Sequence, residues 1–142
     1  MGKVRDILSA KGQNVYFVEP SMMVYNAVER MCEKNIGALL IVDDGRLVGI
    51  FTERDYARKL ILKGKSSKTT PISELMTQNP ITVTPDHTVD ECMTLMTGKF
   101  IRHLPVMENG QLVGLISIGD VVKLTIEEQK DIIEYLENYI SR

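Results

Sequence analysis

Two short stretches of this 142-residue chain share a pattern of residue types that could bind a ligand. They are Gly49-Ile-Phe-Thr52-Glu-Arg-Asp55 and Gly114-Leu-Ile-Ser117-Ile-Gly-Asp120; in both, an apolar pair is followed by a hydroxyl residue and, three positions later, by an aspartate. This pattern is typical of a strand that ends where a helix begins. One interpretation is structural, because a hydroxyl residue at the N-cap and an acid three residues later form a capping box that satisfies unpaired backbone N–H groups.

The second interpretation of the two stretches is nucleotide binding. The first turn of a helix directs free N–H groups and the positive end of the helix dipole outward, and both attract phosphate. Asp55 and Asp120 would repel a phosphate, but each can accept hydrogen bonds from a neutral diol, as the acid of dinucleotide-binding folds does with a ribose. A phosphate beside Thr52 or Ser117, together with a ribose on the aspartate, would make a nucleotide. Both interpretations stay open on the motif alone.

Basic residues flank the two stretches unequally. Arg54 lies inside the first stretch, where the second has Gly119, and Arg102–His103 precede the second stretch at the place where the first has Gly37–Ala38. A guanidinium suits bidentate contact with a phosphate, and a histidine can donate a hydrogen bond or gain charge as the pH falls. The structural alternative for Arg102 and His103 is an exposed strand entry with a hydrogen-bonded imidazole. If the two stretches do bind ligands, their preferences are expected to differ.

The two stretches belong to an internal repeat. A shift of 65 positions places residues 13–61 on 78–126 without a gap, and 15 of the 49 aligned positions are identical. A unit of about 60 residues buries too little surface to be stable alone, so the two copies are expected to bury their apolar faces against each other. The repeat therefore predicts a duplicated architecture.

Each copy has the residue pattern of a β-α-β-β-α unit. An extended piece runs into a Pro followed by Ser or Asp, which is typical of a helix start, and the helix has one apolar stripe of i, i+3, i+4, i+7 spacing, which we interpret as core. Two apolar runs joined by a turn with glycine then indicate a hairpin, and a second helix follows. The expected elements are an extended piece at 15–18 and 81–84, hairpin strands at 38–42 with 47–51 and at 104–107 with 112–116, a final helix at 53–62 and from 118 onward, and a short preceding helix at 4–9 and 72–76.

The predicted division of the chain follows from this repeat. It has a first repeat with its N-terminal helix at 1–62, a polar, basic linker at 63–71, a second repeat at 72–125 and a C-terminal helix at 126–142. That last helix is amphipathic, with isoleucines at 126, 133 and 140 on one side and acidic residues on the other. Its apolar stripe is expected to pack either on its own domain or across a dimer.

The doubled unit, the repeated motif and the segments at 35–55 and 100–120 closely resemble a tandem CBS-domain pair. The resemblance covers nearly the whole chain. It implies an α/β fold of the α+β type, with two repeats packed by pseudo-two-fold symmetry. It also implies a regulatory module that binds an adenosine-containing ligand (AMP, ADP, ATP, NAD or S-adenosylmethionine) in clefts between the repeats, has no catalytic cofactor, forms a homodimer and acts on an unidentified regulated protein.

The resemblance also implies roles for particular residues. Thr52 and Ser117 would contact phosphate or ribose, and Asp55 and Asp120 would hold the ribose hydroxyls. The arginines and the histidine would face phosphates, and the backbone near residues 16, 37–38 and 82 would lie against the base. The complete predicted set is Tyr16, Gly37, Ala38, Thr52, Arg54, Asp55, Thr82, Arg102, His103, Ser117, Gly119 and Asp120.

Composition narrows the class of protein. A hydrophobic fraction of 44% argues against disorder, and no apolar run approaches the roughly 18 residues that a membrane span needs. Residues 1–10 also lack the apolar segment of a secretory signal, so we expect a cytoplasmic protein.

The cysteines and the charge fit this class. Cys32 and Cys92 have no partner motif, so we interpret both as reduced core thiols. The net charge of −2 is the sum of +4 in residues 1–70 and −6 in 71–142, an excess too small to predict nucleic-acid binding.

An enzyme is not expected. The sequence has no arrangement typical of a Ser/His/Asp or Cys/His nucleophile, no P-loop and no metal-ligand cluster. The alternative to a nucleotide sensor is a ligand-silent dimerisation or interaction module, in which Thr52 and Ser117 act only as helix caps.

Overall fold

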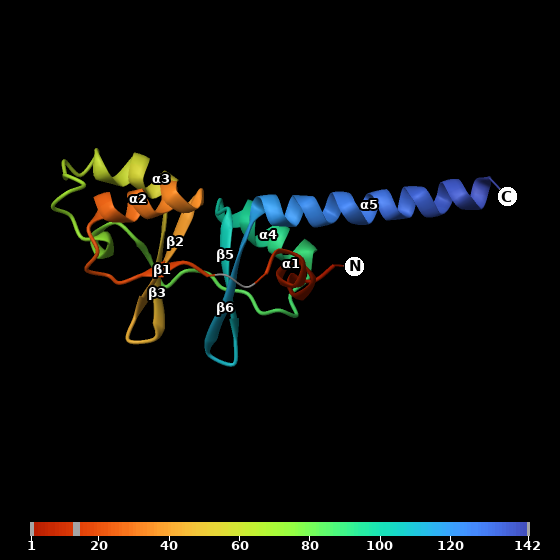
Figure 1. The fold of residues 1–142 in the computed structure, drawn as a ribbon, viewed down its shortest axis with the longest axis horizontal. Coiled ribbons are helices and arrows are strands. Elements are labelled where there is room, and N and C mark those ends of the chain that lie inside the picture. Colours follow the sequence, from red (N-terminus) through yellow and green to blue (C-terminus); the bar gives the residue numbers. More distant parts are fainter. Residues whose placement is uncertain (1, 13–14, 142) are drawn as a thin grey trace. The chain divides into compact units, whose positions relative to one another are not determined.

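The computed structural model describes residues 2–12 and 15–141 and divides into two compact units, each with its own hydrophobic core. One unit is the continuous segment Val15–Ile81, and the other combines Met1–Asn14 with Thr82–Arg142. Figure 1 shows the elements along the chain. The mixed α/β class and the C-terminal helix agree with the sequence analysis.

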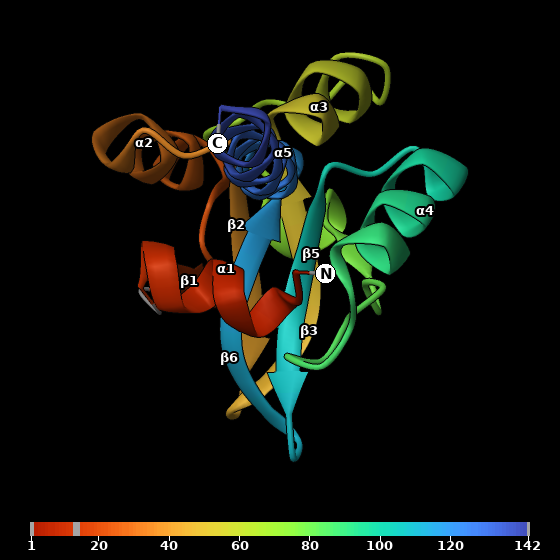
Figure 2. The same ribbon diagram turned by 90° about the vertical axis from the view of Figure 1, so that its right-hand side faces the viewer.

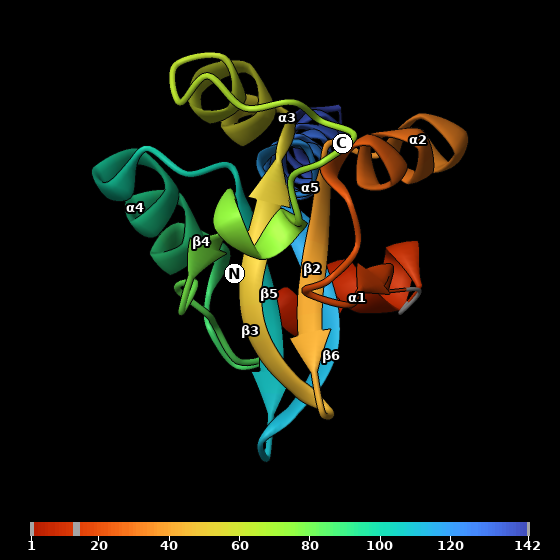
Figure 3. The ribbon, with the colours of Figure 1, turned by 90° about the vertical axis from the view of Figure 1, so that its left-hand side faces the viewer.

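The unit Val15–Ile81 is built on a four-stranded sheet with the order β1-β2-β3-β4. Figure 3 labels β2, β3 and β4 of this sheet. β1 is parallel to β2, whereas β2–β3 and β3–β4 are antiparallel. Its elements are β1 (Phe17–Val18), α2 (Val24–Lys34), β2 (Ala38–Asp43), β3 (Arg46–Thr52), α3 (Glu53–Asp55), the π-helical turn η1 (Tyr56–Leu60), the 3-10 turn η2 (Ile72–Glu74) and β4 (Thr77–Gln78).

The other unit contains the second copy of the repeat on a two-stranded antiparallel sheet. α1 packs against β6, and α4 packs against β5 (Figure 2). Its elements are α1 (Val4–Lys11), α4 (Val89–Lys99), β5 (His103–Glu108), β6 (Gln111–Ser117) and α5 (Ile118–Ile140).

Local geometry confirms the duplication in detail. The hairpin turns Asp44–Gly45 and Asn109–Gly110 both have positive φ at both residues, the conformation of a type I′ turn. Each hairpin also has an irregularity at the same place, between Ile41 and Val42 in one and between Val106 and Met107 in the other. Every one of these pairs is separated by the 65 positions of the repeat.

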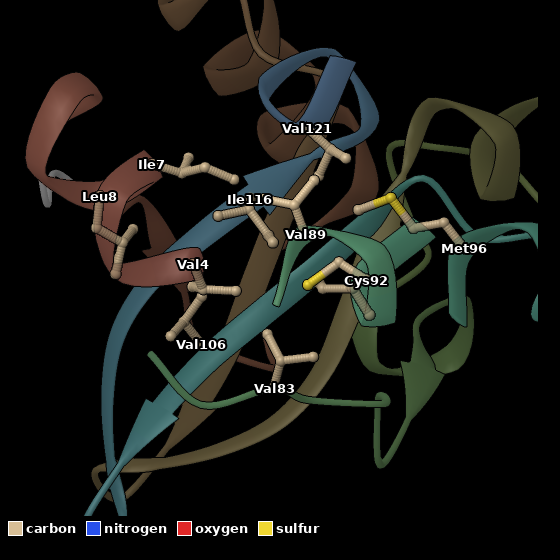
Figure 4. Close-up of a cluster of buried hydrophobic side chains, with 11 residues drawn as sticks. Val4, Ile7, Leu8, Val83, Val89, Cys92, Met96, Val106, Ile116 and Val121 are labelled. Carbon is tan, nitrogen blue, oxygen red and sulfur yellow. The ribbon is translucent and has the colours of Figure 1, made fainter. Parts of the chain in front are cut away.

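The apolar stripes predicted for the two repeat helices lie in the cores. Met31 of α2 is buried with Phe51 of β3 in one unit, and Met96 of α4 is buried with Ile116 of β6 in the other. Figure 4 shows the second of these cores. Cys92 belongs to it, and burial raises the pKa of its thiol to about 11, so the thiol is protonated at neutral pH. The expectation for Cys32 was wrong, because its position on α2 leaves it exposed.

The short helix ahead of each copy packs on the other copy. α1 precedes the first copy, yet it contacts β6 and α5 of the second, and Leu8 lies over Gly114. The segment that opens with η2 precedes the second copy, yet Ile72 and Leu75 are buried in the core of the first. The sequence ranges proposed for the two repeats stay a prediction, since the compact units follow these contacts rather than the order of the chain.

Two expected elements differ in the structure. Residues 81–84 form no strand but only a single parallel bridge, Val83 with Val106. The helix expected at 53–62 is regular only over α3 and continues as the π-helical turn η1, from which Lys59 donates hydrogen bonds to the Leu75 carbonyl and the Thr77 hydroxyl. The helix therefore changes from α to π geometry in the turn from which Lys59 contacts the segment leading into β4.

We expect Gly114→Ala to destabilise the protein by about 1–3 kcal/mol, because a Cβ there would lie 2.6 Å from Cδ2 of Leu8, a buried side chain with little room to turn. Gly98→Ala is the matched control. Gly98 lies on an exposed part of α4, and a Cβ added there would have no other atom within 4 Å, so alanine should stabilise the protein by about 0.5–1 kcal/mol. Urea denaturation checks both variants, and an equal effect of the two substitutions would contradict the close approach of α1.

Candidate functional site

The first motif forms a reciprocal cap where β3 meets α3. The Thr52 hydroxyl accepts the Asp55 backbone N–H at 3.1 Å, and Asp55 Oδ2 accepts the Thr52 backbone N–H at 3.0 Å. Both residues are half-buried. These two hydrogen bonds hold the carboxylate in one orientation at the end of the strand.

The second motif repeats this geometry where β6 meets α5. The Ser117 hydroxyl accepts the Asp120 N–H at 3.2 Å, and Asp120 Oδ2 accepts the Ser117 N–H at 2.8 Å. The capping interpretation is therefore confirmed in both copies. A third capping box, Thr88 with Glu91 at the start of α4, has the same arrangement outside the repeated motif, so the cap by itself does not identify a ligand site.

Each motif aspartate also contacts a lysine, which the sequence analysis missed. Lys59 Nζ lies 3.1 Å from Asp55 Oδ1, and Lys11 Nζ lies 2.7 Å from Asp120 Oδ2. Lys11 donates a second hydrogen bond, of 2.9 Å, to the carbonyl of Leu115. The spacing of four between Asp55 and Lys59 is a readable helix signal. No local pattern could reveal Lys11, which is 109 residues from Asp120.

The electrostatic surroundings of Asp120 favour its ionised form. Burial alone would raise the pKa of this carboxyl group, but the hydrogen bond and charge of Lys11 and the hydrogen bonds from Ser117 outweigh burial and hold the pKa below its ordinary value. The Asp120 side chain is 22% exposed. It is thus an anchored anion that solvent can still reach.

The strand entries predicted to flank the motifs do lie beside them. The Gly37 carbonyl accepts the N–H of Glu53, and Ala38 pairs with Thr52 across the sheet. The Arg102 carbonyl likewise accepts the N–H of Ile118 at 2.9 Å.

His103 pairs with Ser117 across the β5–β6 hairpin and is half-buried, while Arg102 is exposed. The arrangement at this hairpin is therefore equivalent to that at β2–β3. Sequence alignment of the two copies placed these residues correctly because the hairpin register is the same in both.

The remaining predicted residues are mostly at the surface. Tyr16 is 40% exposed, its carbonyl accepts the Leu40 N–H, and its ring lies 5.4 Å from Lys34 Nζ. Arg54, Thr82 and Gly119 are exposed. The predicted set divides between the units, with residues 16–55 of the set in one and residues 82–120 in the other.

A surface hollow of about 590 Å³ adjoins the second motif along α5. It begins at Ile118 and Gly119 and continues past Val122 and Lys123. Its lining is mostly apolar and includes the charged residues Lys123, Glu127 and Lys130. Within the part of the chain that the structure describes, no cluster of His, Cys, Asp or Glu could hold a metal ion.

Comparison with known proteins places the chain in a family. The CBS domain family matches residues 4–62 and 72–127, so the chain belongs to the CBS-domain family and carries two such domains. Over 146 aligned residues it is 40% identical to the CBS domain-containing protein CBSX3, mitochondrial, of Arabidopsis thaliana, covering 96% of this chain and 71% of that protein.

Solved structures of CBS-domain proteins have the same fold. A CBS-domain protein of Burkholderia ambifaria is 51% identical with a TM-score of 0.87, covering 89% of this chain and 96% of that one. CBSX2 in complex with AMP is 30% identical with a TM-score of 0.75, covering 91% and 99%. The CBS domain pair of protein MJ0100 with 5′-methylthioadenosine and S-adenosyl-L-methionine is 29% identical with a TM-score of 0.77, covering 90% and 98%.

Among the helices of residues 2–12 and 15–141, none combines the length and the apolar character needed to span a bilayer.

The lowered pKa of Asp120 predicts how stability responds to acid. Its ionised form stabilises the fold above the ordinary value of 3.8, and this contribution is lost as the pH falls through the lowered pKa of the folded state. We expect the free energy of unfolding to decrease below pH about 4, and Asp120→Asn to make this decrease smaller. Denaturation at pH 7 and near pH 3 checks this, with the exposed Asp131→Asn as control; equal acid sensitivity of both variants and the parent would contradict it.

Proposed function

We propose that this protein is a regulatory module that binds an adenosine-containing ligand through its two CBS repeats and signals the bound state to a partner. The observation that carries the proposal is the repeated motif: in both units an oriented carboxylate lies at a strand-to-helix junction beside the entry of the neighbouring strand. AMP in CBSX2 and the two adenosine compounds in MJ0100 support this class of ligand.

The motif residues have distinct roles in the proposed complex. Asp55 and Asp120 accept the ribose hydroxyls, and Thr52 and Ser117 contact the phosphate or the ribose. The cap fixes each carboxylate before the ligand arrives, which lowers the entropy lost on binding.

The surrounding residues give the two copies different preferences. Arg54, Arg102 and His103 face phosphate groups in the proposed complex, and Gly119 stands where the first copy has Arg54. The base lies against the backbone near Tyr16, Gly37–Ala38 and Thr82. A ligand with more phosphate groups is expected to favour the copy whose motif contains the arginine.

Signalling requires that the ligand bind one arrangement of the protein more tightly than another. In the proposed mechanism the bound state changes the orientation of repeats or subunits, and the regulated protein responds to that change. No turnover of the ligand is proposed, because the sequence has no arrangement typical of a catalytic nucleophile. A cytoplasmic location stays a prediction, since the relative CBSX3 is named as mitochondrial.

The competing function is a ligand-silent interaction module. One observation favours this alternative. The capping box of Thr88 and Glu91 has the same hydroxyl–acid geometry but lies outside the repeated motif, so this geometry can form with a purely structural role. A thermal-shift panel with AMP, ATP, NAD and S-adenosylmethionine separates the two functions, because a ligand that binds the native state raises the melting temperature.

We expect Asp55→Ala and Asp120→Ala each to weaken AMP binding by about tenfold or more, because each removes a charged acceptor of two hydroxyl groups. Glu91→Ala is the matched control, since it also removes the acid of a capping box. Titration calorimetry measures the affinities. Wild-type affinity in both aspartate variants and in the double variant would contradict the ribose role.

We further propose a homodimer in which the apolar stripe of α5 contacts a second copy of the chain. Ile126, Ile133 and Ile140 lie seven residues apart on α5 and are 46%, 55% and 79% exposed, with Leu136 beside them at 49%. Isoleucine at this spacing with an intervening leucine is typical of helices that pair with a like helix. The family match ends at residue 127, so most of the stripe lies beyond the matched domains.

The double variant Ile133→Glu, Leu136→Glu should shift the protein from dimer to monomer, since four charged side chains would enter one helix contact. Tyr135→Glu is the control, because Tyr135 is 70% exposed and projects from the other side of α5. Light scattering after gel filtration measures the mass. A parent protein that is monomeric, or a dimer that survives the double variant, would reject α5 as the contact.

A further inference from the structure

The two lysines that contact the motif aspartates use the carboxylate oxygens differently. In the first copy, the Thr52 N–H donates to Oδ2 of Asp55 while Lys59 Nζ lies 3.1 Å from Oδ1. The two contacts are thus divided between the two oxygens. A carboxylate oxygen has two lone pairs, so each oxygen can accept one further hydrogen bond.

In the second copy both contacts fall on one oxygen. Oδ2 of Asp120 accepts the Ser117 N–H at 2.8 Å and the Lys11 ammonium at 2.7 Å. These two donors use both lone pairs of Oδ2. A vicinal diol that donates one hydrogen bond to each carboxylate oxygen therefore needs the place that Lys11 holds. The Ser117 N–H cannot vacate it without breaking the cap of α5.

Lys11 links this carboxylate to a separate element. It is the last residue of α1, and its ammonium bridges Asp120 and the Leu115 carbonyl of β6. Its side chain is 39% exposed, so it has solvent to move into. Four residues later, at Val15, the chain enters the other compact unit.

We propose that Lys11 competes with the ligand diol for Asp120, so that ligand binding to the second copy releases the C-terminal end of α1. This inference rests on the proposed function and describes how ligand binding at the second copy is regulated. Lys59 does not act in the same way, because its contact is on a different oxygen of Asp55 from the backbone bond and lies within a single helical segment. The copies thereby differ: ligand binding detaches an element in one and leaves the other intact.

The affinity experiment isolates each site with a second substitution. Lys11→Met is measured for AMP binding in an Asp55→Ala background, where only the second copy contributes. Methionine keeps the apolar stem of lysine and removes the competing charge, so the affinity should increase about two- to fivefold, the value of a partly exposed ion pair. Lys11→Arg should stay near the parent. Lys59→Met in an Asp120→Ala background is the matched control and should bind no more tightly than its own parent.

The position of α1 is followed by hydrogen exchange of the full chain. The Gly12 N–H donates to the Leu8 carbonyl at 2.9 Å, which makes the last turn of α1 a sensitive probe. AMP should speed exchange in residues 8–12 of the parent. In Lys11→Met this region should exchange faster already without AMP and should change little when AMP is added.

The outcomes separate the inference from the proposed function. Equal or weaker AMP binding by Lys11→Met overturns the inference and leaves nucleotide binding standing. Unaltered exchange of α1 in a parent that does bind AMP does the same. AMP binding by Lys11→Met, when the parent shows none, supports the inference. No AMP binding by any variant or by the parent rejects the proposed function, and the inference with it.

Discussion

Each copy of the repeat is completed by a segment that lies ahead of the other copy in the sequence. α1 covers the second copy and the segment that opens with η2 covers the first, and both depend on a glycine in the middle of a hairpin strand, Gly114 under Leu8 and Gly49 under Met76. A copy of about 60 residues has too little apolar surface to bury within itself, so this exchanged cover supplies part of the core. One of these segments, α1, also carries Lys11, which contacts the motif aspartate Asp120 of the second copy.

Much of the fold could be predicted because its signals are local. The Asp44–Gly45 and Asn109–Gly110 turns, the apolar stripes of α2 and α4 and the hydroxyl–aspartate pattern each lie within a dozen residues, over which backbone preferences and periodicity operate. The alignment of the two copies then placed Arg102 and His103 beside the second motif, because both hairpins share one register. Because the two copies align, local signals in the sequence also predict which residues lie on neighbouring strands.

Contacts between distant segments could not be predicted in this way. The Lys11–Asp120 pair joins residues 109 positions apart, and nothing in the composition of α1 indicates which carboxylate its last lysine meets. The π-helical turn after Asp55 is another case, since it accompanies tertiary contacts of Lys59 with Leu75 and Thr77 rather than a local preference. The cap is observed in both copies, whereas the ligand interpretation of the motif stays a prediction that the cap does not exclude. A hydrogen-bonded cap uses only part of the acceptor capacity of an aspartate.

The exchange of segments also affects the order in which the protein can form during synthesis. The unit Val15–Ile81 is one continuous stretch, so all of its contacts are available as soon as residue 81 has emerged from the ribosome. The other unit joins the two ends of the described chain, and Leu8 has no partner strand until β6, at Gln111–Ser117, has been made. The apolar face of α1 therefore stays uncovered while about a hundred further residues are added, which takes roughly 5–20 s at common elongation rates. During that time every residue of the unit Val15–Ile81 is already available, whereas α1 still waits for the strand that covers it.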